Sequence, residues 1–155
     1  MSNSVNYLGC LLIGLFLSSC SASNQTPTPI GTTTAPVNVS NPTQTFDPAG
    51  QTLLASGTFV NGGRYTTKGT AKVYEKNGKR TLLLEDFTTD GGPDLRIYLA
   101  DGTTFTSFVE VVSKLSATGN FFVEIPAGYD PAKHGFVLIW CKQFSALFGS
   151  ATLKK

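Results

Sequence analysis

The second part of the chain, residues 51–155, carries the pattern of a protein built from short strands. Apolar and polar residues alternate in runs such as 71–75 and 94–99, which is the period-two pattern of a half-buried strand. Turn residues separate these runs at short intervals, and the pair Asn77-Gly78 is typical of a tight hairpin. We expect eight strands, at residues 53–60, 71–75, 80–87, 94–99, 108–112, 121–125, 136–142 and 147–153. Such spacing is typical of an antiparallel β-sandwich or barrel, and we predict an all-β fold with a single antiparallel β-sandwich.

The N-terminus has the features of an export signal. Residues 8–17 form an uncharged apolar run that is too short to cross a bilayer as an ordinary helix. The small residues Ser18 and Ser19 follow, and then Cys20. This segment resembles the lipobox of bacterial lipoproteins, in which the cysteine is lipidated and becomes the mature N-terminus. We therefore predict a lipoprotein signal peptide at residues 1–19 and lipidation of Cys20. Because no Lys or Arg precedes the run, a plain secretory signal or a short anchor helix is the alternative.

A linker separates this signal from the predicted domain. Residues 21–50 contain five prolines, seven threonines and a single charged residue, Asp47. Such a segment buries too little apolar surface to offset the entropy of ordering it. We predict a flexible tether at residues 20–50 and one folded domain at residues 51–155. The expected location is the bacterial cell envelope, outside the cytoplasm, with the acyl chains of Cys20 in the membrane lipid.

The charged and metal-binding residues exclude several functions. The net charge is +2 and the twelve Lys and Arg residues are scattered, so we expect no nucleic acid partner. One His and three Cys cannot build a zinc ribbon, a Cys₄ iron–sulfur cluster or a His-rich site, and we predict no metal site. The aspartates Asp86, Asp90, Asp94 and Asp101 lack a calcium-loop spacing, and we expect Asp90 and Asp94 to make turn and backbone hydrogen bonds instead.

Cys141 is the residue on which a chemical function could depend. It would be the only free thiol of the mature protein once the signal is removed and Cys20 is lipidated. Alternation along residues 136–142 places Cys141 on one face with Val137 and Ile139, and Trp140 on the other. One interpretation is a buried, inert cysteine. The other is a redox thiol or a cofactor ligand, with Trp140 packed beside it.

The remaining cofactor options are few. A blue-copper site needs two His, and a c-type haem needs a Cys-x-x-Cys-His motif, which is absent. A noncovalent haem held by Cys141 or His134 stays open, so the cofactor is unknown and none is required by the sequence. A Cys–His hydrolase pair is disfavoured, because seven residues of strand would separate these side chains by roughly 23 Å. We expect His134 to be a solvent-exposed turn residue.

Several motifs together resemble the DM-thirteen domain. They are Gly92-Pro93-Asp94-Leu95-Arg96-Ile97-Tyr98-Leu99, then Gly119-Asn120 with Ile125-Pro126, then residues 137–144 around Trp140-Cys141, and Phe148-Gly149-Ser150-Ala151. The resemblance covers about residues 53–153. It implies a β-sandwich-like fold and a role in electron transfer through a near-invariant cysteine, as bare thiol or as ligand to a prosthetic group such as haem. That cysteine corresponds to Cys141.

Two functions follow from these observations. The first is a membrane-tethered redox module centred on Cys141, with an unknown redox or envelope protein as its partner and no stand-alone enzyme activity. The second is a non-catalytic binding or structural module of the cell envelope, in which Cys141 is buried and inert.

Overall fold

The computed structural model describes residues 36–116 and 118–155, and every regular element in this part of the chain is a strand. The strands are β1 (Val37–Asn38), β2 (Thr52–Asn61), β3 (Thr67–Lys76), β4 (Lys79–Thr89), β5 (Leu95–Ala100), β6 (Phe108–Ser113), β7 (Gly119–Glu124), β8 (Phe136–Cys141) and β9 (Ala146–Thr152). The predicted all-β class is confirmed. Each of the eight predicted strands corresponds to one of β2 to β9.

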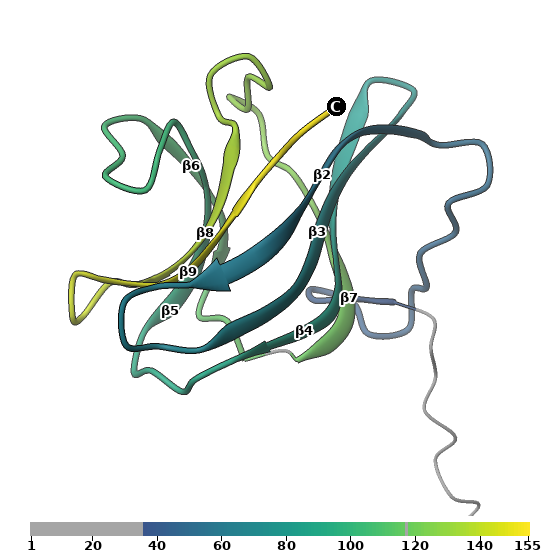
Figure 1. Ribbon diagram of the computed structural model, residues 1–155. Helices are drawn as coiled ribbons and strands as arrows, with labels where there is room; N and C mark the ends of the chain where they lie inside the picture. Colours follow the sequence, from purple (N-terminus) through teal and green to yellow (C-terminus); the bar gives the residue numbers. More distant parts are fainter. Residues whose placement is uncertain (1–35, 117) are drawn as a thin grey trace, which may run out of the picture. The chain divides into compact units, whose positions relative to one another are not determined.

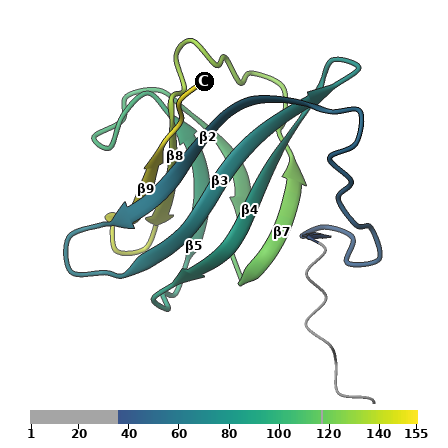
Figure 2. The same cartoon turned by 45° about the vertical axis from the view of Figure 1, so that its right-hand side comes forward.

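The strands form one mixed sheet that curls into a half-barrel (Figures 1 and 2). Their order is β1-β7-β4-β3-β2-β9-β8-β5-β6, and all neighbours are antiparallel except β1 and β7. The curvature brings β6 into contact with β7, which lies near the other end of this order. The predicted two-sheet sandwich is not confirmed, because a single continuous sheet encloses the core.

A bulge between β3 and β4 helps the sheet to bend. The register shifts between Lys68 and Thr70, and Gly69 between them has a φ of +113°. A Cβ atom on Gly69 would lie 2.6 Å from the backbone oxygen of Glu85, so a larger residue does not fit there. On the partner strand, Asp86 also has a positive φ, of 49°. Bulges bend a strand and increase its twist, which an enclosing sheet requires.

The tight turn between β3 and β4 was predicted correctly. Asn77 and Gly78 have φ angles of 54° and 78°, so both central residues are left-handed, as a type I′ turn requires. The flanking residues Lys76 and Lys79 are paired across the hairpin.

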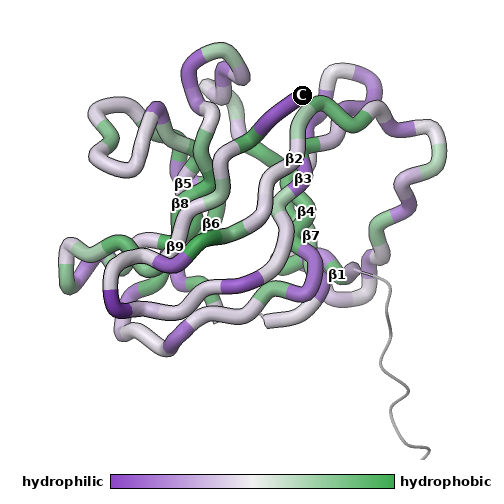
Figure 3. The backbone as a smooth tube through the Cα atoms, in the orientation of Figure 1, coloured by the Kyte–Doolittle hydropathy of each residue, from purple (hydrophilic) through white to green (hydrophobic). Residues whose placement is uncertain are grey.

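The main core lies inside the half-barrel. β8 contributes to it from a nearly continuous hydrophobic run, which is green in Figure 3. The fully buried large side chains of this core include Phe87, Phe121, Phe148, Leu82, Leu84, Ile97, Leu99 and Ile139. Complete burial of a side chain of this size stabilises the fold by about 1.5–3 kcal/mol. A second, smaller cluster around Leu138 and Tyr98 lies on the outer face of β5 and β8.

The end of the predicted tether is packed against the sheet. β1 pairs with Phe121 and Phe122 of β7. Phe46 is 8% exposed, and its ring centroid lies 5.1 Å from that of Tyr74 and 5.4 Å from that of Phe122. The predicted signal peptide at residues 1–19, the lipidation at Cys20 and the tether up to residue 35 lie outside the described residues. Within residues 36–116 and 118–155, no helix is long and apolar enough to span a membrane.

Candidate functional site

The two most distinctive sequence motifs lie side by side on neighbouring strands. β5 follows the Pro93-Asp94 pair, and β8 ends at Cys141. Their antiparallel register pairs Leu95 with Cys141 and Arg96 with Trp140. The backbone N–H of Lys142 donates to the backbone oxygen of Asp94 over 2.9 Å, which fixes the two motifs together at the end of the strand pair.

Cys141 lies in the core, with its side chain inside the half-barrel. It is 0% exposed and has no disulfide partner among the described residues. It belongs to the same core cluster as Val137 and Ile139, so the predicted face of Cys141 is confirmed. Ala146 stands opposite it on β9, and two small side chains at this pair leave room for the larger core residues around them. In this conformation the sulfur is shielded from solvent.

Trp140 lies on the opposite face of β8, as predicted. It packs against the outer cluster that contains Leu138 and Tyr98. Its ring meets that of Phe105 edge to face, with centroids 5.1 Å apart. Trp140 is partly exposed and faces the solvent side of β8, so it does not pack against the sulfur of Cys141 inside the core.

A group of charged residues lies next to Trp140 on the outer face. The Nε and Nη2 groups of Arg96 donate to the two carboxylate oxygens of Asp94 over 2.9 and 3.1 Å, and its Nη1 donates to Glu110 over 2.8 Å. The hydrogen bonds from Arg96 hold the pKa of Asp94 below its usual range. Hydrogen bonds to both carboxylates raise the pKa of Arg96 further. Asp94 and Arg96 therefore stay ionised around neutral pH, and their ion pair fixes the start of β5.

His134 is buried, so its prediction as a solvent-exposed turn residue was wrong. It is 4% exposed because the loop between β7 and β8 folds over the end of the half-barrel. Its Nδ1 accepts the backbone N–H of Asp130 over 3.0 Å, and its Nε2 lies 3.2 Å from the hydroxyl of Ser107. Because Nδ1 accepts a hydrogen bond, the proton of the neutral ring is on Nε2, which donates to Ser107. His134 precedes β8 and Cys141 ends it, so the two side chains lie at opposite ends of the strand.

The surroundings of these residues do not fit a haem. The sulfur of Cys141 is enclosed by core side chains on every side, so no face is open to a macrocycle. Both ring nitrogens of His134 already have hydrogen-bond partners. Within the described part of the chain, no three or more His, Cys, Asp or Glu side chains are grouped to hold a metal ion.

Asp90 makes the predicted hydrogen bond to backbone, because it accepts the N–H of Thr66 over 2.8 Å. The carboxylate of Asp94 is paired with the side chain of Arg96 instead. Asp101 accepts the hydroxyl of Thr106 over 2.7 Å and also backbone N–H groups of its own loop, and these hydrogen bonds lower the pKa of Asp101. Asp101 thus holds its own loop, whereas Asp90 joins two segments that are 24 positions apart in the sequence.

The sequence did not reveal two contacts near the motif strands. Glu110 was not identified as a partner of Arg96, since nothing in a single sequence shows that β6 lies beside β5. Tyr65 stacks on Phe148 with ring centroids 3.6 Å apart. No pattern in the sequence indicates this contact, because Tyr65 and Phe148 lie in distant segments of the chain.

Fold and site together define an all-β domain whose described residues hold a single thiol, which is buried at the end of the neighbouring strands β5 and β8. The sequence model of the family described as electron transfer DM13 matches residues 58–153, and the chain belongs to this family. The match runs from within β2 to just beyond β9, so it includes both motif strands. The predicted resemblance to the DM-thirteen family is confirmed. Neither the curated proteins nor the solved structures gave a match to the chain.

Proposed function

We propose that the protein is an electron-transfer module of the bacterial cell envelope that is tethered to the membrane and whose redox role depends on Cys141. The observation that carries the proposal is the membership in the electron transfer DM13 family, together with the place of Cys141 on the strand pair that both family motifs form. Cys141 is the sole cysteine within the described residues.

The tether gives the module its location. The lipobox-like segment that ends at Cys20 supports lipidation of that residue, and more than one acyl chain gives stable anchoring. Residues 21–35 are rich in Thr and Pro and connect Cys20 to β1. The domain would thus be held near the membrane surface, where envelope redox proteins are available as partners.

The burial of Cys141 favours a second function. A cysteine that is 0% exposed is inert as long as the fold stays closed. In this alternative the domain is a binding or structural module, and Cys141 only fills space in the core. The two functions differ in whether the sulfur of Cys141 reacts in the native protein.

The test is made on protein purified from its own membrane. The redox function predicts a thiol that reacts with a labelling reagent before the fold is denatured, and Cys141→Ser should abolish this labelling. The matched variant Cys20→Ser should lose the membrane fraction and keep the Cys141 result, because it removes only the anchor. A Cys141 thiol that reacts only after denaturation would overturn the redox role. Unchanged membrane association of Cys20→Ser would overturn the lipid tether.

A further inference from the structure

The end of the half-barrel next to the loop between β7 and β8 carries two adjoining cavities that nothing so far assigns to a function. The larger, of about 550 Å³, lies between the start of β2, the loop before β8 and the residues after β9. Its lining includes Leu53, Leu54, Pro131 and Leu153. The smaller, of about 290 Å³, lies between the β3–β4 turn and residues 124–129. Pockets that bind small molecules commonly have about 300–1,000 Å³, so the larger cavity is of ligand size.

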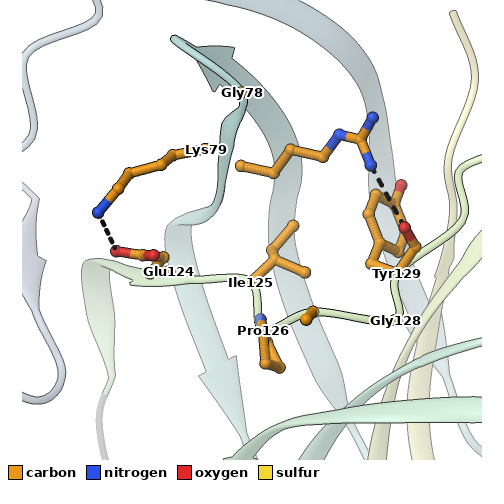
Figure 4. A pocket seen from close by; sticks show the side chains of 9 residues that line it. Gly78, Lys79, Glu124, Ile125, Pro126, Gly128 and Tyr129 are labelled. Carbon is orange, nitrogen blue, oxygen red and sulfur yellow. Dashed lines mark hydrogen bonds and ion pairs between the residues drawn. The ribbon is translucent and has the colours of Figure 1, made fainter.

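Arg80 and Tyr129 line both cavities and form the boundary between them. The Nη1 group of Arg80 donates to the backbone oxygen of Tyr129 over 3.3 Å, and its guanidinium lies 5.6 Å from the centre of the Tyr129 ring. The ring of Tyr129 also stacks on that of His134, with ring centroids 6.0 Å apart. Figure 4 shows the smaller cavity, with Tyr129 on one side and the ion pair of Lys79 with Glu124 on the other. This stack holds Arg80 in a fixed position.

The guanidinium of Arg80 has donors to spare. Its Nε donates to the carboxylate of Glu75 over 2.9 Å and its Nη1 donates to the backbone oxygen of Tyr129, whereas its Nη2 group makes no hydrogen bond to another described residue. Arginine presents five N–H donors in a planar fork that suits a carboxylate. Lys155 also lines the larger cavity, and the acidic side chain in this lining, Glu75, is already paired with Arg80.

We propose that this end of the half-barrel binds an amphiphilic carboxylate, a molecule with an apolar chain and one anionic head. The chain would lie along Leu53, Leu54 and Leu153 in the larger cavity, and the head would accept hydrogen bonds from the Nη2 group of Arg80. Apolar walls supply the affinity through burial, and the fixed guanidinium selects the charged head. The site is at the opposite end of β8 from Cys141, so the proposal is independent of the redox function.

The test uses calorimetric titration with dodecanoate, below its micelle concentration, on the full chain carrying Cys20→Ser, so that no lipid is attached to the protein. Dodecanoate should bind, and dodecanol should bind about tenfold more weakly or worse, because it lacks the charged head. Butyrate, which has the head without the long chain, should show no binding. Absence of dodecanoate binding, or equal affinity for dodecanol, would overturn the proposal.

Two matched variants on β2 locate the site. Leu53 is 48% exposed at the cavity, and Val60 is 61% exposed near the other end of the same strand. Leu53→Asp should weaken dodecanoate binding by about tenfold or more, because it places a like charge at the cavity, whereas Val60→Asp should change it by less than about twofold. Arg80→Gln should remove the preference for dodecanoate over dodecanol, with circular dichroism as the check on folding. Equal effects of the two β2 variants would place the binding elsewhere.

Discussion

The two ends of β8 differ in that one holds a buried thiol and the other lies beside a ligand-sized cavity. At one end, Cys141 carries the single thiol of the described chain and is packed on every side. At the other end, past Phe136, a ligand-sized cavity lies open beside Arg80. Five residue steps of strand separate Phe136 from Cys141, which is roughly 17 Å at about 3.3 Å per residue. The family motifs lie at the end that holds Cys141, whereas the larger cavity lies at the end near Arg80.

Residue type and accessibility are therefore independent indications of a functional site. A buried sulfur serves a redox role only if the fold opens or if electrons reach it through the protein. A cavity beside a fixed cation can bind a ligand without any reactive group. Each end can therefore be altered without affecting the other, and the comparison can be tested by substitutions placed at either end.

The largest expected difference is in the free energy of unfolding when a leucine at either end is shortened to alanine. Leu95 is 5% exposed and is paired with Cys141, whereas Leu53 is 48% exposed at the cavity. Leu95→Ala should lower the free energy of unfolding by about 2–5 kcal/mol, because it leaves a hole in a closed core. Leu53→Ala should change it by less than about 0.5 kcal/mol, as for other exposed sites. Urea denaturation measures both, and similar losses would show that the two ends are packed alike.

Substitutions of Cys141 itself sharpen the comparison at an intermediate scale. Cys141→Ala removes one buried sulfur and should lower the free energy of unfolding by about 1 kcal/mol. Cys141→Ser keeps the size of the side chain but buries a hydroxyl that has no hydrogen-bond partner. It should lower the free energy of unfolding by about 1–3 kcal/mol more than Cys141→Ala does. Chemical denaturation of the two variants, side by side, gives the difference. If Ser is tolerated as well as Ala, the side chain reaches water, and the sulfur is more accessible than its burial indicates.

Much of the local structure could be predicted because it depends on local physics. Alternation placed Cys141 and Trp140 on their correct faces, since the period of a strand is fixed at two. The Asn77-Gly78 turn was predictable because few residue pairs tolerate two positive φ angles. The strand order was not, because β9 lies between β2 and β8, a long-range pairing that no local pattern specifies.

The errors at the cavity end have a common cause. His134 was predicted to be exposed because its loop contains Pro, Lys and Gly, yet the loop closes over the barrel end and buries the ring. Phe46 lies in a Thr- and Pro-rich segment but finds a place beside Tyr74. In both cases a tertiary contact outweighs local composition. Arg80 was likewise not identified as a candidate, since its position between two cavities depends on the folded loop.

The smallest expected effect compares the carboxylates that flank β5, Asp94 at the Cys141 end and Asp101 at the other. Both pKa values are lowered by hydrogen bonds in the folded protein, Asp94 through Arg96 and Asp101 chiefly through Thr106. A lowered pKa in the folded state stabilises the fold above the ordinary value of about 4, and this stabilisation disappears as the pH falls through the folded value. Asp94→Asn and Asp101→Asn should therefore each be less stable than the unsubstituted protein at pH 7, and the deficit should shrink below about pH 4.

Salt distinguishes these two carboxylates. Asp94 is bound to a cation, so in about 1 M NaCl, where the screening length is about 3 Å, the deficit of Asp94→Asn at pH 7 should shrink. Asp101 is bound by a hydroxyl and by backbone N–H groups, so the deficit of Asp101→Asn should persist. Thermal unfolding at low and high salt measures both deficits. If Asp101→Asn loses its deficit in salt as Asp94→Asn does, Asp101 is held by charge, and the two ends of β5 are fixed by the same kind of interaction.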